Sequence, residues 1–246
     1  MLIDTDKQVN KWIDLWASKD WEAIMIVGNG EGLLDAPIGL FWEDSIFRIG
    51  INRAFMLGHL NVLIHIDEFP EKNLFNESLF HSGGFDTEFK TQIIKANAVF
   101  NVYDNNKGGT TTSHFHKPDL EKELKYRYDN NPIDKGLYRR KNSLYPCLDL
   151  ACRISKRDIP IILSGISFDK RSHFYKYKFN IQNNNSNPYK PFFKKTVEKL
   201  WTSEMEETIK FIMNDKFDIR YTDNSKLLER IGAMKIDYNS LNYTYD

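Results

Sequence analysis

Glycines and polar side chains follow the apolar segments of this chain at positions where they could do chemistry. The apolar residues 22–27 run directly into Gly28-Asn29-Gly30-Glu31-Gly32, and residues 46–51 are followed by Asn52. A glycine turn lets backbone amides approach a phosphate closely. This turn lacks the glycine spacing of the dinucleotide fingerprint and the Lys-Ser/Thr pair of a P-loop. It therefore predicts either a phosphate contact or a plain tight connection between a strand and a helix.

Two further apolar segments end in carboxylates. Asp67 and Glu68 follow residues 61–66, and Asp169 closes the stretch Gly165–Asp169 that follows residues 159–163. A carboxylate at the end of a strand can hold a divalent cation or take a proton from an acceptor hydroxyl. The alternative for Asp67 is a loop carboxylate that caps the next turn.

A histidine and two basic segments add a second kind of chemistry. His173 lies in the basic stretch after Gly165 and could act as a base that moves with a lid. Residues 138–145 and 170–178 interleave Lys and Arg with aromatic side chains. Such segments bind a pyrophosphate and stack a base, contact nucleic acid, or form a solvated charged face.

The segments that precede these residues are apolar nearly throughout, which is typical of strands buried on both faces of a parallel sheet. Strands are expected at 22–27, 46–51, 61–66, 98–102, 159–163 and 218–221, and helices at 6–19, 144–156, 191–214 and 224–231. Open parallel sheets bind ligands outside the carboxyl ends of their strands, near the point where the strand order reverses. The residues with chemical potential should therefore meet at one edge of the sheet.

We expect one domain over residues 1–246. It consists of an N-terminal helix (1–21), a nucleotide-binding core (22–169), a lid loop (170–190) and a C-terminal helix with a strand–helix unit (191–246). The fold class is α/β, a Rossmann-like, mostly parallel sheet with helices on both faces.

Composition limits the partners. The chain carries 34 basic and 34 acidic residues among 246, so its formal net charge is zero, and a uniformly basic nucleic-acid binder is not expected. We find no apolar run long enough for a transmembrane helix and no secretory signal, and we expect a cytoplasmic protein. Cys147 and Cys152 are the only cysteines, and their spacing predicts two small core residues rather than a disulfide or metal site.

The ordered motifs resemble those of glycosyltransferase family 42, the bacterial sialyltransferases. They are Val27-Gly28-Asn29-Gly30, Asn52, Arg140-Lys141-Asn142-Ser143, the stretch 162–168 and the final unit 218–228. The resemblance implies a GT-A-like variant of the Rossmann-like fold and a nucleotide-sugar donor. It implies that Gly28, Asn29 and Gly30 contact the donor's phosphate and ribose, that Asn52, Gly165 and Asp169 lie at the nucleotide, and that Arg140 and Ser143 lie near the leaving phosphate.

A related group, the 6-hydroxymethylpterin pyrophosphokinase-like and motility-associated proteins, has a similar scaffold and an Asp after the third strand, as at Asp67. The chain departs from the sialyltransferase pattern at Ser167 and Asp169, where that family has Asp and Tyr, and the family's lid histidine motif is absent. The resemblance thus implies a nucleotide-dependent transferase, but these departures do not support specificity for sialic acid.

The favoured hypothesis is a glycosyltransferase that moves a sugar from a nucleotide-sugar donor to a hydroxyl of a carbohydrate or of a modified nucleobase in DNA. Asp67 or His173 would deprotonate the acceptor, and Arg140 would stabilise the leaving phosphate. One alternative is a diphosphokinase of the hydroxymethylpterin type with Mg²⁺ on Asp67. Two others are a nucleic-acid-binding protein without catalysis and an inactive scaffold. Donor, acceptor, metal dependence and oligomeric state stay open.

Overall fold

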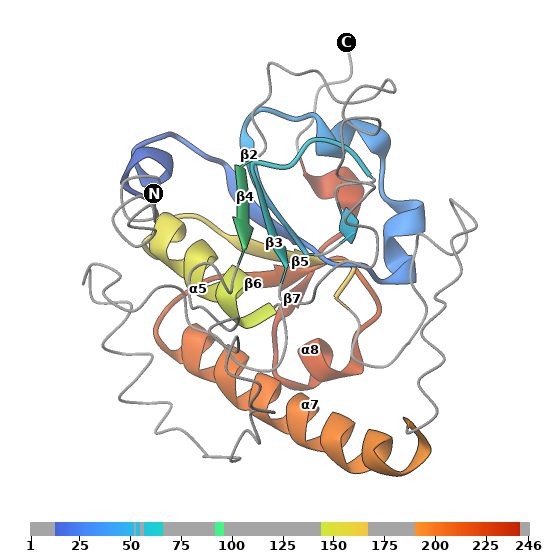
Figure 1. The fold of residues 1–246 in the computed structure, drawn as a ribbon. Helices are drawn as coiled ribbons and strands as arrows, with labels where there is room; N and C mark the ends of the chain where they lie inside the picture. Colours follow the sequence, from blue (N-terminus) through green and yellow to red (C-terminus); the bar gives the residue numbers. More distant parts are fainter. Residues whose placement is uncertain are drawn as a thin grey trace, which may run out of the picture.

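The computed structural model describes residues 13–51, 53–54, 57–65, 92–95, 144–166 and 190–241. Within these ranges seven strands form one sheet in the order β4-β3-β2-β1-β5-β6-β7, and every neighbouring pair is parallel (Figure 1). The strands are β1 (Ala23–Val27), β2 (Ile46–Ile51), β3 (Val62–His65), β4 (Gln92–Lys95), β5 (Ile161–Ser164), β6 (Ile219–Tyr221) and β7 (Met234–Lys235). The expected α/β fold with a mostly parallel sheet is confirmed.

Three α-helices and three short 3-10 helices accompany the sheet in the same ranges. They are α5 (Leu144–Ser155), α7 (Lys190–Asn214), α8 (Lys226–Arg230), η1 (Glu31–Asp35), η2 (Ile38–Phe41) and η6 (Tyr238–Ser240). Residues 13–17 are also helical and belong to the helix expected over 6–19, whose first part lies outside the described residues. No helix in these ranges is both long and apolar enough to cross a membrane.

Side chains of the strands point alternately to the two faces of the sheet, and this divides the core into two layers. Ile24 and Ile26 of β1 join a cluster with α5 and the described part of α7, whereas Met25 and Val27 join a second cluster with η1 and η2. Successive side chains of a strand point to opposite faces of the sheet, so β1 is buried on both sides. This is why its sequence is continuously apolar, as expected for a strand buried on both faces of a parallel sheet.

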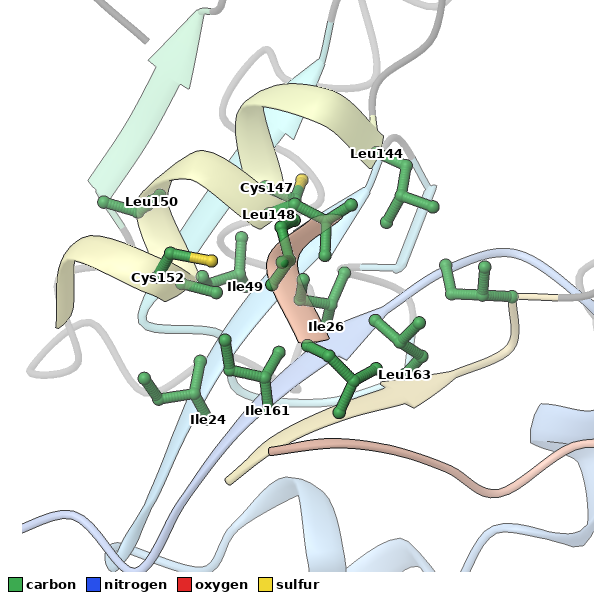
Figure 2. Packing of buried hydrophobic residues seen from close by; sticks show 14 of the residues in the cluster. Ile24, Ile26, Ile49, Leu144, Cys147, Leu148, Leu150, Cys152, Ile161 and Leu163 are labelled. Carbon is green, nitrogen blue, oxygen red and sulfur yellow. The ribbon is translucent and has the colours of Figure 1, made fainter. Parts of the chain in front are cut away.

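Helix α5 lies directly over the centre of the sheet. Figure 2 shows Cys147, Leu148 and Cys152 of this helix beside Ile24 and Ile26 of β1. Pro146 stands in its first turn, where a missing amide hydrogen costs no helical bond. Both cysteines are free and buried, which confirms them as core residues.

The C-terminal unit ends the sheet. Ser225 caps α8 by accepting a hydrogen bond from the Leu228 amide, and Gly232, which follows the helix expected at 224–231, takes the left-handed conformation (φ 79°) that stops it.

Two strands were not expected. β4 contains only two apolar residues within Gln92–Lys95, and β7 is a two-residue edge strand, so neither carries a clear strand pattern. The strand expected at 98–102 and residues 170–189 of the expected lid lie outside the described residues, and Lys190, the last residue of that lid, begins α7. The other expected strands and helices agree with the structure to within about two residues at each end.

Candidate functional site

The site is defined by the order of the strands. Strands β2, β3 and β4 lie on one side of β1, and β5, β6 and β7 lie on the other, so the direction of winding reverses between β1 and β5. In a parallel sheet the carboxyl ends of all strands lie at the same edge, and ligands bind where the order reverses. The segments that follow Val27 and Ser164 occupy that point.

Glycines let these two segments cross in backbone contact, and we call the contact the glycine crossing (Gly28, Gly30 and Gly165). The Gly28 amide donates to the Ser164 carbonyl oxygen at 2.7 Å, and the Gly30 amide donates to the Gly165 carbonyl oxygen at 2.8 Å. A Cβ at Gly28 would lie 2.3 Å from the Gly165 oxygen, and one at Gly30 would lie 2.8 Å from it. These two amides are already hydrogen-bonded within the protein, so the contact between the segments accounts for both glycines.

Gly165 needs to be a glycine for two reasons. Its φ is +67°, in the left-handed region that side chains rarely adopt. A Cβ there would also lie 2.3 Å from Cδ1 of Leu33, a buried residue of η1. The turn after β5 is therefore fixed by the packing of η1 against it.

Asn29 joins the crossing to the neighbouring strand. Its Nδ2 donates to the carbonyl oxygen of Ile51, the last residue of β2, at 2.9 Å. Its Oδ1 is buried and has no hydrogen-bond partner within the described ranges. A buried amide oxygen with no donor carries a desolvation penalty of about 1–3 kcal/mol, and a ligand that supplies a donor would remove it.

Asp223 holds the other side of the crossing. Its Oδ2 accepts a hydrogen bond from the Ile166 amide at 2.9 Å, while Oδ1 lies beside Gly32, where an added Cβ would come within 2.0 Å of it. Burial raises the pKa of this carboxyl to about 6, although hydrogen bonds from the Ile166 and Gly165 amides lower it in part. Carboxyl groups with a shifted pKa that lie at the ligand-binding edge of a sheet are candidates for functional residues.

Sequence reasoning did not find Asp223. The pattern predicts a strand at 218–221 and a helix at 224–231, and Asp223 lies in the short connection between them. The signal was present, because Asp223 follows strand β6 closely, and the rule that directed attention to Asp67 and Asp169 applies equally there.

Three hydroxyls, two of them on the buried residues Ser164 and Tyr238, form a triangle beneath this site. The Ser164 and Tyr238 hydroxyl oxygens lie 2.7 Å apart, and the Thr222 hydroxyl donates to Tyr238 at 3.0 Å and to Ser164 at 3.2 Å. Burial first, and then the charge of Asp223, raises the pKa of Tyr238 to about 12, so its hydroxyl is protonated at neutral pH. The triangle fixes the ends of β5 and β6 relative to η6.

A pocket with a volume of about 500 Å³ opens beside the glycine crossing, on the side of η1 and β6. Its lining comes from η1, from the turn after β6 and from the segment that runs from β7 into η6. The lining residues are Gly32, Asp35, Pro37, Thr222, Asp223, Asn224, Lys235, Ile236, Asp237, Tyr238 and Asn239. The size is within the range of small-molecule sites in proteins.

The structure brings together four of the residues predicted for the site, namely Gly28, Asn29, Gly30 and Gly165. The others lie outside the described residues and stay predictions. They are Asn52, Asp67, Arg140, Ser143, Asp169 and His173. Within the described ranges no group of three or more His, Cys, Asp or Glu side chains could hold a metal ion. Asp67, where a metal site is expected, lies outside these ranges.

Comparisons with known proteins add a limited finding. No protein-family model and no curated protein matches the chain. Among solved structures, the monofunctional α-2,3-sialyltransferase Cst-I from Campylobacter jejuni is similar with a TM-score of 0.43 and 16% sequence identity, over 92% of this chain and 84% of that one. The α/β fold of this chain is established by its own strand order and parallel pairing.

Proposed function

We propose that this chain is a transferase that binds a nucleotide-sugar donor at the glycine crossing and passes the sugar to an acceptor hydroxyl. The observation that carries the proposal is the position of the crossing. It lies at the reversal of strand order of a parallel sheet, which is where open α/β sheets bind their ligands.

The crossing offers a rigid floor for a ligand. Gly28, Gly30 and Gly165 present backbone without side chains, and Asn29 presents a buried oxygen to which no described residue donates. A nucleotide carries donors on its ribose and base that satisfy such an acceptor. Because two of the glycine amides are already bonded to carbonyl oxygens, we assign the donor's phosphates to other groups.

Several parts of the proposal rest on the resemblance to the bacterial sialyltransferases. Arg140 and Ser143 would lie near the leaving phosphate, and Asn52 and Asp169 near the nucleotide. Asp67 or His173 would take the proton from the acceptor hydroxyl, a contribution typically worth about a hundred- to ten-thousand-fold in rate. Asp67 would hold Mg²⁺ if the reaction depends on a metal.

The test is a thermal-shift panel of CMP, UDP, GDP and adenine nucleotides and their sugar conjugates, each with Mg²⁺ and with a chelator. A true ligand at a hundred times its dissociation constant stabilises the protein by about 2.7 kcal/mol. The same panel is repeated with Asn29→Ala and with Asn61→Ala as the matched control. Asn61 also bonds a backbone group of β2, through its Oδ1 and the Arg48 amide at 2.7 Å, but near the amino ends of the strands.

We expect one nucleotide family to stabilise the wild type and Asn61→Ala by similar amounts, and to lose most of its effect on Asn29→Ala. No shift with any nucleotide would sink the proposal. Binding that disappears with the chelator would support metal dependence and direct attention to Asp67.

A further inference from the structure

The pocket beside the glycine crossing carries a charge pattern that selects its ligand. Among the described residues that line it, three carry carboxylates (Asp35, Asp223 and Asp237) and one carries an amine (Lys235), whose Nζ donates to Asn224 Oδ1 at 2.7 Å. A phosphate placed there would meet a surplus of negative charge. Hydroxyl groups suit the pocket better, because carboxylate and amide oxygens accept hydrogen bonds from them.

Asp223 adds a second, independent observation. Its side chain lines the pocket and is only 7% exposed, and one of its carboxylate oxygens, Oδ1, has no hydrogen-bond partner among the described residues. A buried carboxylate is normally paired or fully hydrogen-bonded. The described residues supply no donor for this oxygen, which leaves a ligand in the pocket as a candidate source of one.

The wall behind Asp223 is rigid. The Ile166 amide holds Oδ2, and the hydroxyl triangle of Ser164, Thr222 and Tyr238 fixes the strand ends on either side. Gly32 leaves the space that the carboxylate occupies. A ligand hydroxyl would therefore meet an acceptor that is already oriented, which lowers the entropic cost of binding.

We propose that this pocket binds the hydroxyl groups of a sugar ring, with Asp223 as their principal acceptor. This inference rests on the proposed function and extends that function by naming the chemical groups that the pocket binds. The sugar ring could belong to the ribose of the nucleotide donor or to the acceptor substrate. Both offer the same hydroxyl chemistry, and the experiment separates them.

The proposal predicts how binding depends on pH. Among the described residues, the groups that face Asp223 are Asp35 from η1, Lys235 from β7, Tyr238 from η6 and the amides of Gly165 and Ile166. Burial places the pKa of the carboxyl at about 6, and a hydroxyl donor favours the charged form. Binding should accordingly strengthen as the pH rises through 6 and be about tenfold weaker at pH 5 than at pH 7.5.

The experiment is isothermal titration of the full chain at pH 5, 6 and 7.5 with two sets of probes. The first set is the ribonucleoside monophosphates and their 2′-deoxy counterparts. The second is neutral sugars (galactose, N-acetylglucosamine and lactose). Asp223→Asn removes the charge, and Asp218→Asn is the control, because Asp218 precedes β6 and pairs with Arg220 at the opposite end of the strand.

A second variant keeps the test independent of folding. Asp237→Asn removes another carboxylate from the pocket at an exposed position, where the side chain accepts only from the nearby Asn239 amide among the bonds described. It should weaken binding of the same probe several-fold. Melting temperatures of all variants show which of them are folded.

Each outcome decides the question. Ribonucleotides that bind at least about tenfold more tightly than deoxynucleotides, with the preference lost in Asp223→Asn, support the ribose as the source. Neutral sugars that bind in an Asp223-dependent way support the acceptor, and if no nucleotide binds, they support the pocket while the proposed function fails. A third outcome is that ribonucleotides and deoxynucleotides bind equally, neutral sugars do not bind, and Asp223→Asn changes nothing. That outcome overturns the proposal for the pocket but leaves the proposed function standing. No binding of either kind overturns both.

Discussion

Gly165 and Gly232 share a left-handed backbone and differ in what surrounds them. Their φ angles are +67° and +79°, but a Cβ at Gly165 would lie 2.3 Å from Leu33 Cδ1, whereas no described residue comes within 4 Å of a Cβ at Gly232. We expect Gly232→Ala to cost about 1–2 kcal/mol for backbone strain alone. Gly165→Ala should cost about 2–4 kcal/mol, because overpacking against Leu33 is added.

Urea unfolding of the two variants at equal protein concentration measures the difference. The pair isolates the effect of packing at the glycine crossing, since the backbone term is common to both. Equal losses of stability would mean that η1 moves away from the turn without cost, and the crossing would then not be rigid.

Asp223 gives the stability of the fold a pH dependence of known sign. Its pKa is raised from 3.8 to about 6 in the folded chain, so the folded state binds more protons than the unfolded state between these values. The contribution of this group to stability is full below about pH 4 and is lost as the pH rises through 6. Its size is on the order of 3 kcal/mol.

The free energy of unfolding of the wild type and Asp223→Asn, measured from pH 4 to pH 8, tests this term. The difference between the two should change over this range and level off above pH 7. Other carboxyls cancel in the difference, among them Glu206, whose pKa is lowered first by its hydrogen bond from Lys210. A difference that stays constant with pH would show that Asp223 does not titrate in this range.

At the scale of elements, a buried arginine joins strand β2 to helix η2. Arg48 is 1% exposed, and its Nη1 donates to the carbonyl oxygens of Leu40 at 3.2 Å and Glu43 at 2.5 Å. Burial lowers its pKa to about 10, which leaves it charged at neutral pH. Arg48→Met should cost about 2–4 kcal/mol, because two buried carbonyl oxygens lose their donor.

Arg220→Met is the matched control for that variant. Arg220 also lies within a strand, but its side chain is about one-third exposed and pairs with the exposed Asp218, so its loss should cost under about 1 kcal/mol. Differential scanning calorimetry of both variants checks the prediction. Similar losses would indicate that water replaces the guanidinium of Arg48 at the carbonyl oxygens.

The same scale shows why some elements could be predicted. Apolar runs identified β1, β2, β3 and β5 because most positions of each strand carry an apolar side chain. Strand β4, with two apolar residues, and the edge strand β7 are defined by pairing with their neighbours, which a single sequence does not reveal.

The sequence predicts only part of the site, because the order of the strands in the sheet decides which distant residues meet there. The glycine crossing follows from local motifs, since Gly28 comes directly after the apolar residues 22–27 and Gly165 comes one residue after the apolar segment 159–163. Asp223 reaches the crossing through the pairing of β5 with β6, and residue 166 lies 57 positions before it in the chain. Only the order of the strands brings these two residues together.

The same topology places both cysteines at the centre of the molecule and leads to a prediction for the whole fold. Helix α5 packs on β1, β2 and β5, and Cys147 and Cys152 are 0% and 2% exposed. Burial also raises the pKa of Cys147, so its reactive thiolate is scarce. If the fold opens only as a unit, a thiol reagent should reach either sulfur at least about a thousandfold more slowly than in urea-unfolded protein.

Labelling with a disulfide reagent at pH 8, followed by mass spectrometry, measures this rate. Because the chain has only two cysteines, each modification is assigned without ambiguity. Ser203→Cys, on an exposed position of α7, is the control and should react at the rate of an unfolded thiol. Rates for Cys147 and Cys152 that follow the global unfolding rate as urea is added would show that α5 and the sheet open together. Fast labelling in the absence of urea would show instead that α5 leaves the sheet on its own, and the core would then not be a single cooperative unit.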